Sequence, residues 1–194
     1  MSLTLSSSEW IVALLILAPT LYAMIKGAPF VPTPMAQVRR MLKEAQLKKG
    51  MVLYDLGSGD GRLVHVASKE YQVKAIGYEF SPLVWAWSKC LALFWRSGAS
   101  LRFGNFWKKD LSDADVIVCY LLPHSMQEVR RKLLSQLKPG TLIISHGFKM
   151  EEIEVWRHLP FDREKKLGSI WIYKIKGETK TAKDTLTKKR SKKG

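Results

Sequence analysis

The sequence predicts an α/β fold in which a doubly wound sheet of seven strands follows an N-terminal transmembrane helix. One apolar run of 16 residues without a charge, at 10–25, indicates that helix. From residue 51 onward, short apolar runs alternate with helical segments, an order typical of a parallel sheet covered by helices. A chain of 194 residues is long enough for one such domain. The predicted parts are an anchor at 1–28, a linker and cover helix at 29–50, the α/β domain at 51–175 and a disordered basic tail at 176–194.

The composition points to an anionic partner or surface. The chain has 32 Lys and Arg residues against 17 Asp and Glu residues, a formal charge of +15. Its two cysteines exclude a disulfide-stabilised scaffold. The tail from residue 176 carries eight basic residues and no apolar periodicity, so we expect it to be disordered. It either tethers the protein to anionic lipid or RNA, or serves only as a solubilising segment.

The apolar run at 10–25 has a borderline length for a single-pass anchor. At about 1.5 Å per residue it spans roughly 24 Å, slightly less than a hydrocarbon core of about 30 Å. No Lys or Arg precedes it, which disfavours a cleaved signal peptide. The basic residues after it predict that the rest of the chain is cytoplasmic, or at the mitochondrial inner membrane in a eukaryote: Lys26, Arg39, Arg40 and Lys43. The alternative is a buried or interfacial helix.

A strand, a glycine-rich turn, a helix and a second strand follow one another from residue 51. Their sequences are MVLYDL, GSGDG, RLVHVASKEY and VKAIGYE. Gly57, Gly59 and Gly61 permit positive φ and a close approach of the backbone to a ligand at the helix N-terminus. The carboxylates of Asp55 and Asp60 would repel a pyrophosphate but suit a cationic ligand. The pattern therefore predicts a site for a nucleotide-like molecule with a positive charge.

Glu79 closes the second strand, where a carboxylate can accept hydrogen bonds from both hydroxyls of a ribose. With Asp55 and the glycines near the amino-acid moiety, the site is that expected for S-adenosylmethionine. Asn105 and Phe106 end the third strand, where an amide can bind adenine and a ring can stack on it. The alternative interpretation makes them a turn residue and a core phenylalanine.

The remaining segments complete the predicted sheet. Ser81 is expected to cap a helix with Pro82 at its first position, and Gly98 ends that helix. A strand at 115–122 precedes a helix at 124–137, a fifth strand at 141–148, a short helix at 151–159 and a closing hairpin at 161–175. The seven strands are expected to begin at 51, 73, 100, 115, 141, 161 and 169.

Before the first strand, Thr33 is a suitable N-cap with Pro34 at the first helical position. The helix that follows has one apolar stripe, made by Met35, Val38, Met41, Leu42 and Ala45. This stripe predicts a cover helix packed on the sheet.

Taken together, the chain resembles a family of seven-strand methyltransferases with one membrane anchor. This family includes the mitochondrial lysine methyltransferases that act on the ATP synthase c-subunit and on the adenine nucleotide translocase, and their prokaryotic relatives. Besides the anchor, the matching segments are PFVPTP at 29–34, YDLGSGDGR at 54–62, GYE at 77–79, GNFW at 104–107 and YLLP at 120–123. The resemblance implies a Rossmann-like class I methyltransferase sheet, transfer of a methyl group to a protein lysine, and a segment over the methyl donor that includes Thr33. We therefore predict that Thr33 is a catalytic residue together with Tyr120 and Pro123. The basic tail departs from the family pattern and leaves the substrate and localisation open.

Methyl transfer from a sulfonium requires mainly alignment of the acceptor and exclusion of water. Burial of a lysine beside the sulfonium lowers its pKa, so a dedicated general base is not required. Tyr120 and Pro123 follow the fourth strand and are expected to line the acceptor channel, while Leu121 and Leu122 are equally consistent with core positions. His124 and His146 follow strands at the same edge, but surface or capping roles are favoured for them. No spacing of His and Cys indicates a metal.

Three functions fit these features. The first is a protein-lysine methyltransferase with a membrane protein as substrate and a membrane lipid surface as a further partner. The second is a methyltransferase for RNA or a small lipid-like molecule, and the third is a non-catalytic donor-binding module. A minimal domain with an open cleft favours a macromolecular acceptor. Nucleic acid is disfavoured because no basic and aromatic surface motif occurs within the predicted domain, and the complete donor site disfavours the binding module.

Overall fold

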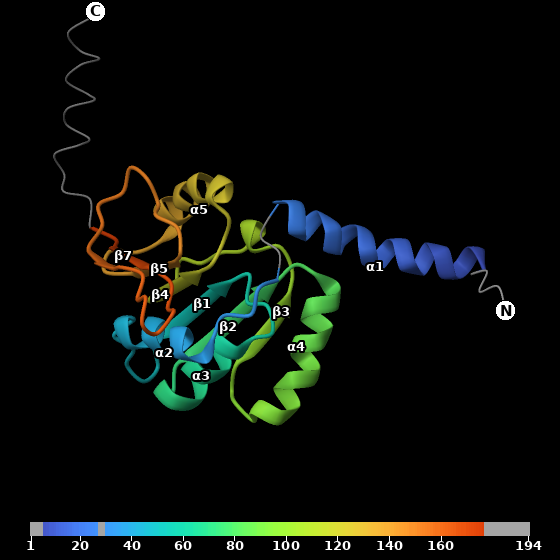
Figure 1. Ribbon diagram of the computed structural model, residues 1–194, viewed down its shortest axis with the longest axis horizontal. Coiled ribbons are helices and arrows are strands. Elements are labelled where there is room, and N and C mark those ends of the chain that lie inside the picture. Colours follow the sequence, from blue (N-terminus) through green and yellow to red (C-terminus); the bar gives the residue numbers. More distant parts are fainter. Residues whose placement is uncertain (1–5, 27–29, 177–194) are drawn as a thin grey trace, which may run out of the picture.

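The computed structural model describes residues 6–26 and 30–176 and has one seven-stranded sheet with helices on both faces (Figure 1). The helices are α1 (Ser7–Lys26), α2 (Met35–Glu44), α3 (Arg62–Tyr71), α4 (Pro82–Trp95) and α5 (Pro123–Gln136), with a 3₁₀ turn η1 (Phe106–Lys108). The strands are β1 (Val52–Leu56), β2 (Lys74–Glu79), β3 (Ser100–Phe103), β4 (Val116–Cys119), β5 (Leu142–His146), β6 (Arg157–Leu159) and β7 (Ile170–Lys174).

The strand order is β3-β2-β1-β4-β5-β7-β6. Strands β1 to β5 are parallel, whereas β7 runs antiparallel to β5 and β6 antiparallel to β7. The chain winds outward in one direction through β2 and β3, and in the other through β4 and β5. The direction therefore changes between β1 and β4, where open α/β sheets bind ligands at the carboxyl ends of the strands. The predicted α/β fold with seven strands is confirmed.

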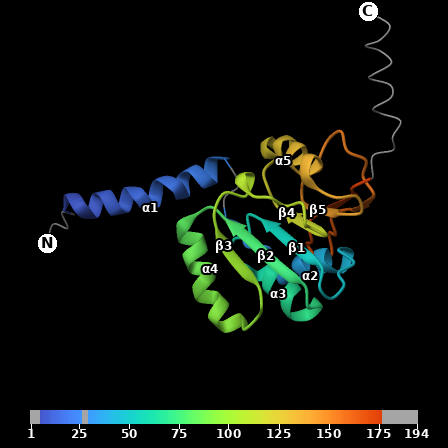
Figure 2. The same ribbon diagram turned by 180° about the vertical axis from the view of Figure 1, so that it is seen from behind.

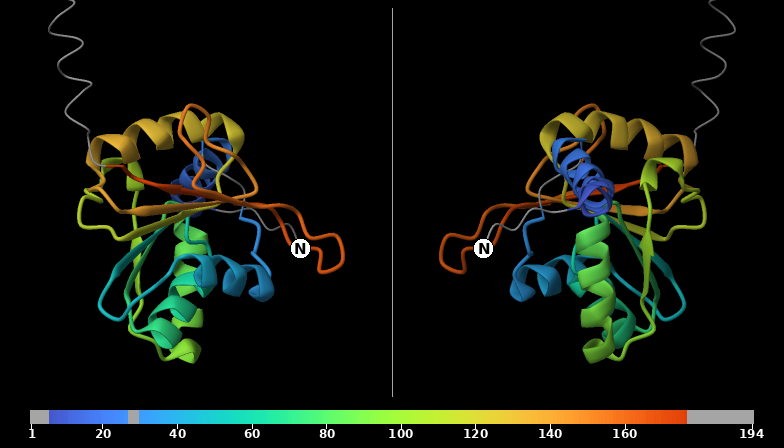
Figure 3. Two further views of the ribbon diagram at one scale, coloured as in Figure 1. Left: turned by 90° about the vertical axis from the view of Figure 1, so that its left-hand side faces the viewer. Right: turned by 90° about the vertical axis from the view of Figure 1, so that its right-hand side faces the viewer.

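Two apolar clusters cover the two faces of the sheet. Helices α2, α3 and α4 lie on one face and α5 on the other (Figure 3). The cover-helix prediction is confirmed, because the apolar stripe of α2 packs into the first cluster; its buried members are Val38, Met41, Leu42 and Ala45. The helix α4 starts as expected, since the Ser81 hydroxyl accepts a hydrogen bond from the Val84 amide at 3.3 Å.

Two local predictions are wrong. Residues 151–159 do not form a helix: a turn leads into β6, which pairs with β7. Burial in this segment alternates, with Ile153 and Val155 packed on the core and Glu154 and Trp156 exposed, and this two-residue period is that of a strand. The sixth strand accordingly begins at 157 rather than 161.

The predicted N-cap of α2 is also wrong. Pro34 occupies the cap position and no side chain caps the helix. Thr33 instead contributes its carbonyl oxygen, which accepts a hydrogen bond from Nη1 of Arg62 at 2.8 Å. This bond attaches the linker to the first turn of α3.

The predicted anchor segment forms α1, which projects away from the domain and packs against α4 (Figures 1 and 2). Large apolar side chains on α1 are exposed, among them Trp10, Leu14 and Leu15. Within the described ranges, no helix is sufficiently long and apolar to cross a membrane, so the predicted transmembrane helix is not confirmed. The tail predicted to be disordered lies outside the described residues from 177 onward.

Candidate functional site

The glycine turn connects β1 to α3 at the carboxyl edge of the sheet. Gly57, Gly59 and Gly61 have φ values of 84°, 56° and 81°. These values lie in the left-handed region, where the backbone of a residue with a side chain is strained. The amides of Gly57 and Ser58 both donate to the carbonyl oxygen of Tyr78, at 2.9 and 3.0 Å. The turn is therefore fixed to the end of β2, and the backbone of the chain forms the floor of the site.

The linker before α2 covers this turn. A Cβ added to Gly59 would lie 2.7 Å from a ring carbon of Phe30. Together with the bond from Arg62 to the Thr33 carbonyl, this contact places residues 30–33 against the turn. This position of residues 30–33 is consistent with the expectation that the segment lies over the methyl donor. The predicted role of Thr33 in catalysis stays a prediction.

Glu79 joins the turn to the next helix. Its Oε2 accepts a hydrogen bond from the Gly59 amide at 2.9 Å, and its Oε1 accepts one from the Ser81 amide at 2.8 Å. Burial raises the pKa of the carboxyl group, and these backbone hydrogen bonds oppose the increase. A carboxylate has about four lone-pair sites and this one accepts backbone hydrogen bonds from Gly59, Phe80 and Ser81, so it retains the capacity to accept a ribose hydroxyl. Sequence reasoning assigns the ribose role to Glu79 but misses its structural one.

Three carboxyl groups meet at this edge. Asp55 is buried, and burial, with the nearby charges of Glu79 and Asp60, raises its pKa to about 7. Asp60 forms a salt bridge with Arg62, whose Nη2 lies 2.5 Å from Oδ2. The charge of Asp60 is thus compensated within the chain, whereas that of Asp55 is destabilised until a cation arrives.

We predict that affinity for S-adenosylmethionine increases as pH rises through about 7, the pKa of Asp55. Below this pH the carboxyl is neutral, and above it the ionised form attracts a cationic donor. The stability of the donor-free protein should change in the opposite sense: because the folded pKa exceeds the ordinary value of 3.8, the contribution of Asp55 to stability is complete below pH 3.8 and is lost as pH rises from there to about 7. Calorimetric titrations at several pH values measure the affinity, and Asp55→Asn should remove most of the dependence. An unchanged pH profile in that variant would assign the effect to another group.

The site fits the expected methyl donor. The turn presents backbone where a Cβ would reduce the space, and the buried Ser58 hydroxyl has no hydrogen-bond partner within the part of the chain that the structure describes. This hydroxyl lies against Gly77 of β2, where an added Cβ would be 2.6 Å from it, so the turn packs closely on the strand that ends at Glu79. Asp55, Glu79 and the backbone amides of the turn would hold the methyl donor. Carboxylates and backbone amides are groups that suit a sulfonium and an amino-acid moiety.

Asn105 and Phe106 have roles in the chain itself. The Asn105 Oδ1 accepts a hydrogen bond from the Trp107 amide at 3.0 Å and so caps η1. Phe106 is buried in the second apolar cluster. These are the turn and core positions of the alternative interpretation, and the adenine contacts of both residues stay predictions.

The carboxyl edge of the sheet brings Tyr120 and His146 together; we call this pair the acceptor edge, and the acceptor roles of Tyr120 and Pro123 stay predictions. Their ring centroids are 4.2 Å apart, at the carboxyl ends of β4 and β5, while Pro123 begins α5 and Leu121 is buried. The surface role favoured for His146 is wrong, because its ring is buried and packs against Gly168. Burial and the charge of Arg40 lower its pKa to about 4, so the imidazole is neutral. His124, in contrast, is exposed.

The sequence profile of the ANTKMT methyltransferase domain matches residues 55–157. A protein-lysine N-methyltransferase of Saccharolobus islandicus is 40% identical over 137 residues, which cover 68% of this chain and 82% of that protein. The ATP synthase c-subunit lysine N-methyltransferase of Xenopus laevis is 37% identical over 125 residues, 62% of this chain and 53% of the relative. The chain thus spans about half the length of the frog relative.

A solved structure is also similar. An RNA methyltransferase from Salinibacter ruber in complex with S-adenosyl-L-homocysteine superposes with a TM-score of 0.71 at 35% sequence identity, covering 76% of this chain and 95% of that chain. Its bound S-adenosyl-L-homocysteine is the product that S-adenosylmethionine leaves after methyl transfer. S-Adenosylmethionine is therefore the cofactor of the site described above.

Proposed function

The chain belongs to the ANTKMT methyltransferase family, whose members use S-adenosylmethionine, and we propose that it methylates a lysine of a membrane protein. One observation carries the assignment: the family match at 55–157 includes every residue predicted to bind the donor, from Asp55 through Glu79 to Phe106. The names of the relatives support the acceptor, since they specify the ATP synthase c-subunit and the adenine nucleotide translocase.

S-Adenosylmethionine supplies an electrophilic methyl group on a positively charged sulfur. The glycine turn and Glu79 orient the donor, and the linker at Phe30 limits the access of water to the turn. The acceptor edge offers Tyr120 beside a neutral His146, so no fixed positive charge of this pair opposes an approaching lysine. Proximity to the sulfonium lowers the pKa of the lysine ammonium and supplies the uncharged nucleophile.

The proposed location is a membrane, with α1 as a single-pass attachment and the catalytic domain on the cytoplasmic side, or at the mitochondrial inner membrane in a eukaryote. The exposed apolar side chains of α1 support attachment, and the basic residues after the helix support the orientation. Attachment of enzyme and substrate to one membrane raises their effective concentration. A small domain can therefore be selective with few direct contacts.

We expect deletion of residues 1–26 to decrease methylation of a membrane acceptor by about 100-fold or more, because the gain in effective concentration is lost. Membranes are incubated with radiolabelled donor and either the full chain or the truncated protein, and the labelled residue is identified. Donor affinity, measured by calorimetry, should be the same for both proteins. Equal labelling of the membrane protein by the two forms would contradict the proposed role of α1.

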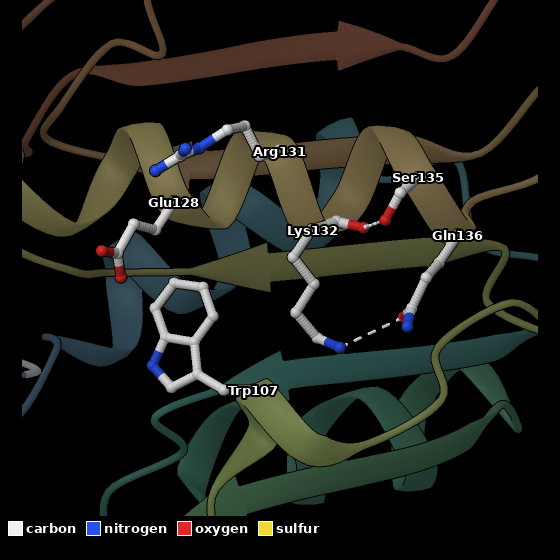
Figure 4. Close-up of a pocket in the computed structure, with 6 residues that line it drawn as sticks. All are labelled: Trp107, Glu128, Arg131, Lys132, Ser135 and Gln136. Atoms are coloured by element: carbon white, nitrogen blue, oxygen red, sulfur yellow. Dashed lines mark hydrogen bonds between the residues drawn. The ribbon is translucent and has the colours of Figure 1, made fainter.

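RNA is a second candidate acceptor, favoured by the description of the Salinibacter ruber neighbour. A shallow groove of about 470 Å³ between η1 and α5 combines Trp107 with Arg131 and Lys132 (Figure 4). However, Nζ of Lys132 donates to the carbonyl oxygen of Lys109 at 2.7 Å, and Glu128 adds a negative charge to the groove. The groove thus offers a weaker anion site than its residue types indicate. Label that resists protease but not ribonuclease would identify RNA as the acceptor.

A further inference from the structure

The helix α4 has an apolar face that is directed to solvent. Leu83, Trp87, Leu93 and Phe94 are exposed, with Phe94 exposed to 84%, whereas Ser88 is completely buried. Leu83, Trp87, Cys90 and Phe94 are spaced four, three and four residues apart, so they form one stripe along the helix. This distribution is the reverse of that in a helix whose outer face is in water. A contiguous exposed apolar stripe indicates an interaction surface.

Two exposed basic residues lie on α4 or at its C-terminal end, Lys89 and Arg96. The segment 80–109, which runs from the end of β2 through α4 and β3 to η1, contains no Asp or Glu. The other three basic residues of the segment lie elsewhere: Lys108 is in η1, and Arg102 and Lys109 lie over the ring of Tyr78 on the opposite face of the sheet. An apolar helix face with flanking cations and no acidic residue is typical of a helix that lies in the interface of a membrane, because anionic headgroups attract the cations.

The same face is continuous with α1. The two helices are in contact, and α1 carries further exposed apolar side chains, among them Trp10 and Leu14 (Figure 1). The helix α4 begins three residues after Glu79, so its N-terminal end lies at the edge of the sheet that carries the donor site.

We propose that the outer face of α4 lies on an anionic lipid bilayer as a second membrane contact beside α1. This inference rests on the proposed attachment to a membrane and adds an orientation to it. With both helices in contact with the bilayer, the carboxyl edge of the sheet is held at the membrane surface. The accessible acceptors are then lysines close to the headgroups, and lysines in domains that extend far from the membrane are excluded.

The native thiols permit a direct test with the full chain. Cys90 is exposed on the proposed face and Cys119 is buried, so an environment-sensitive dye labels Cys90 selectively. Vesicles contain phosphatidylcholine and phosphatidylglycerol with a fraction of headgroup-nitroxide lipid. We expect the dye at Cys90 to lose most of its emission. A matched control carries Cys90→Ser with Ser135→Cys, which moves the dye to α5 on the opposite face of the sheet, and its emission should persist.

Substitution provides an independent test. Leu93→Gln with Phe94→Gln should prevent quenching at Cys90, while the control Leu134→Gln with Phe161→Gln, which alters exposed apolar residues elsewhere, should not. If the protein sediments with the vesicles but Cys90 stays bright, the inference about α4 is overturned and the membrane attachment by α1 survives. If the protein does not sediment, the attachment itself fails. A dye that is already shielded without vesicles in a dimer would assign the face to a second copy and also overturn the proposal.

Discussion

Replacement of Gly57 by valine is expected to eliminate methyl transfer and to weaken donor binding by about 5- to 150-fold. Gly57 has a φ of 84°, and its amide donates to the Tyr78 carbonyl at 2.9 Å. A Cβ at this position would lie 3.5 Å from Cδ2 of Leu121, and we expect the further methyl groups of valine to obstruct the approach of the donor to the turn. Such overpacking costs about 1 to 3 kcal/mol, and each 1.4 kcal/mol corresponds to about tenfold in affinity. Calorimetry measures the donor affinity, and a radiolabel assay measures the transfer.

Gly50→Val is the matched control for this substitution. Gly50 has a φ of 86°, and a Cβ there would have no atom within 4 Å. Both variants therefore carry the backbone strain of a branched residue in the left-handed region, about 1 to 3 kcal/mol, and should lose similar thermal stability. Only Gly57→Val should lose donor binding. Equal donor affinity in the two variants would show that the glycine turn is a structural feature and not part of the donor site.

The parts of the molecule predicted correctly depend on local signals. The glycines at 57, 59 and 61 come between a buried strand and a helix, and each needs the left-handed backbone that only glycine adopts readily. The start of α4 is encoded by the Ser81–Pro82 pair, whose capping geometry involves only the next three residues. Helix starts and turns of this kind are determined by neighbouring residues, so they can be predicted without knowledge of the tertiary structure.

The features missed depend on contacts between distant segments. Threonine commonly caps helices, but in this protein the carbonyl oxygen of Thr33 accepts a hydrogen bond from Arg62 of α3. Pro34 occupies the cap position instead. His146 resembles many surface histidines in sequence, and its burial follows from the approach of Tyr120 and Gly168. No local pattern encodes such pairs, because each joins segments that are far apart in the sequence.

The exposed face of α4 is a further feature that the sequence alone does not predict. The cap and the length of the segment SPLVWAWSKCLALFW predict a helix correctly. Apolar residues occur on all sides of this helix, so periodicity alone does not identify the side that packs on the sheet. The structure buries Ser88 and exposes Phe94, and the exposed stripe becomes visible only then.

Glu79→Ala is expected to weaken binding of S-adenosylmethionine by about 1.5 to 3 kcal/mol, the range for hydrogen bonds to a charged group. The loss has two physical sources in this protein. The ribose hydroxyls lose their proposed acceptor, and the amides of Gly59 and Ser81 lose the carboxylate that holds the turn against α4. Glu79→Gln keeps the size of the side chain but places a donor opposite one of these amides, so we expect an intermediate affinity.

Asp115→Ala separates these effects from a general loss of stability. The Asp115 carboxylate also accepts a backbone hydrogen bond, from the Val52 amide at 2.8 Å, but it lies at the start of β4, at the opposite end of the strands. Both alanine variants should therefore decrease the unfolding temperature, whereas only Glu79→Ala should decrease donor affinity. Measured by calorimetry on folded protein, an affinity of Glu79→Ala equal to that of Asp115→Ala would remove Glu79 from the donor site. It would leave the carboxylate with the structural role alone, as the group that joins the glycine turn to α4.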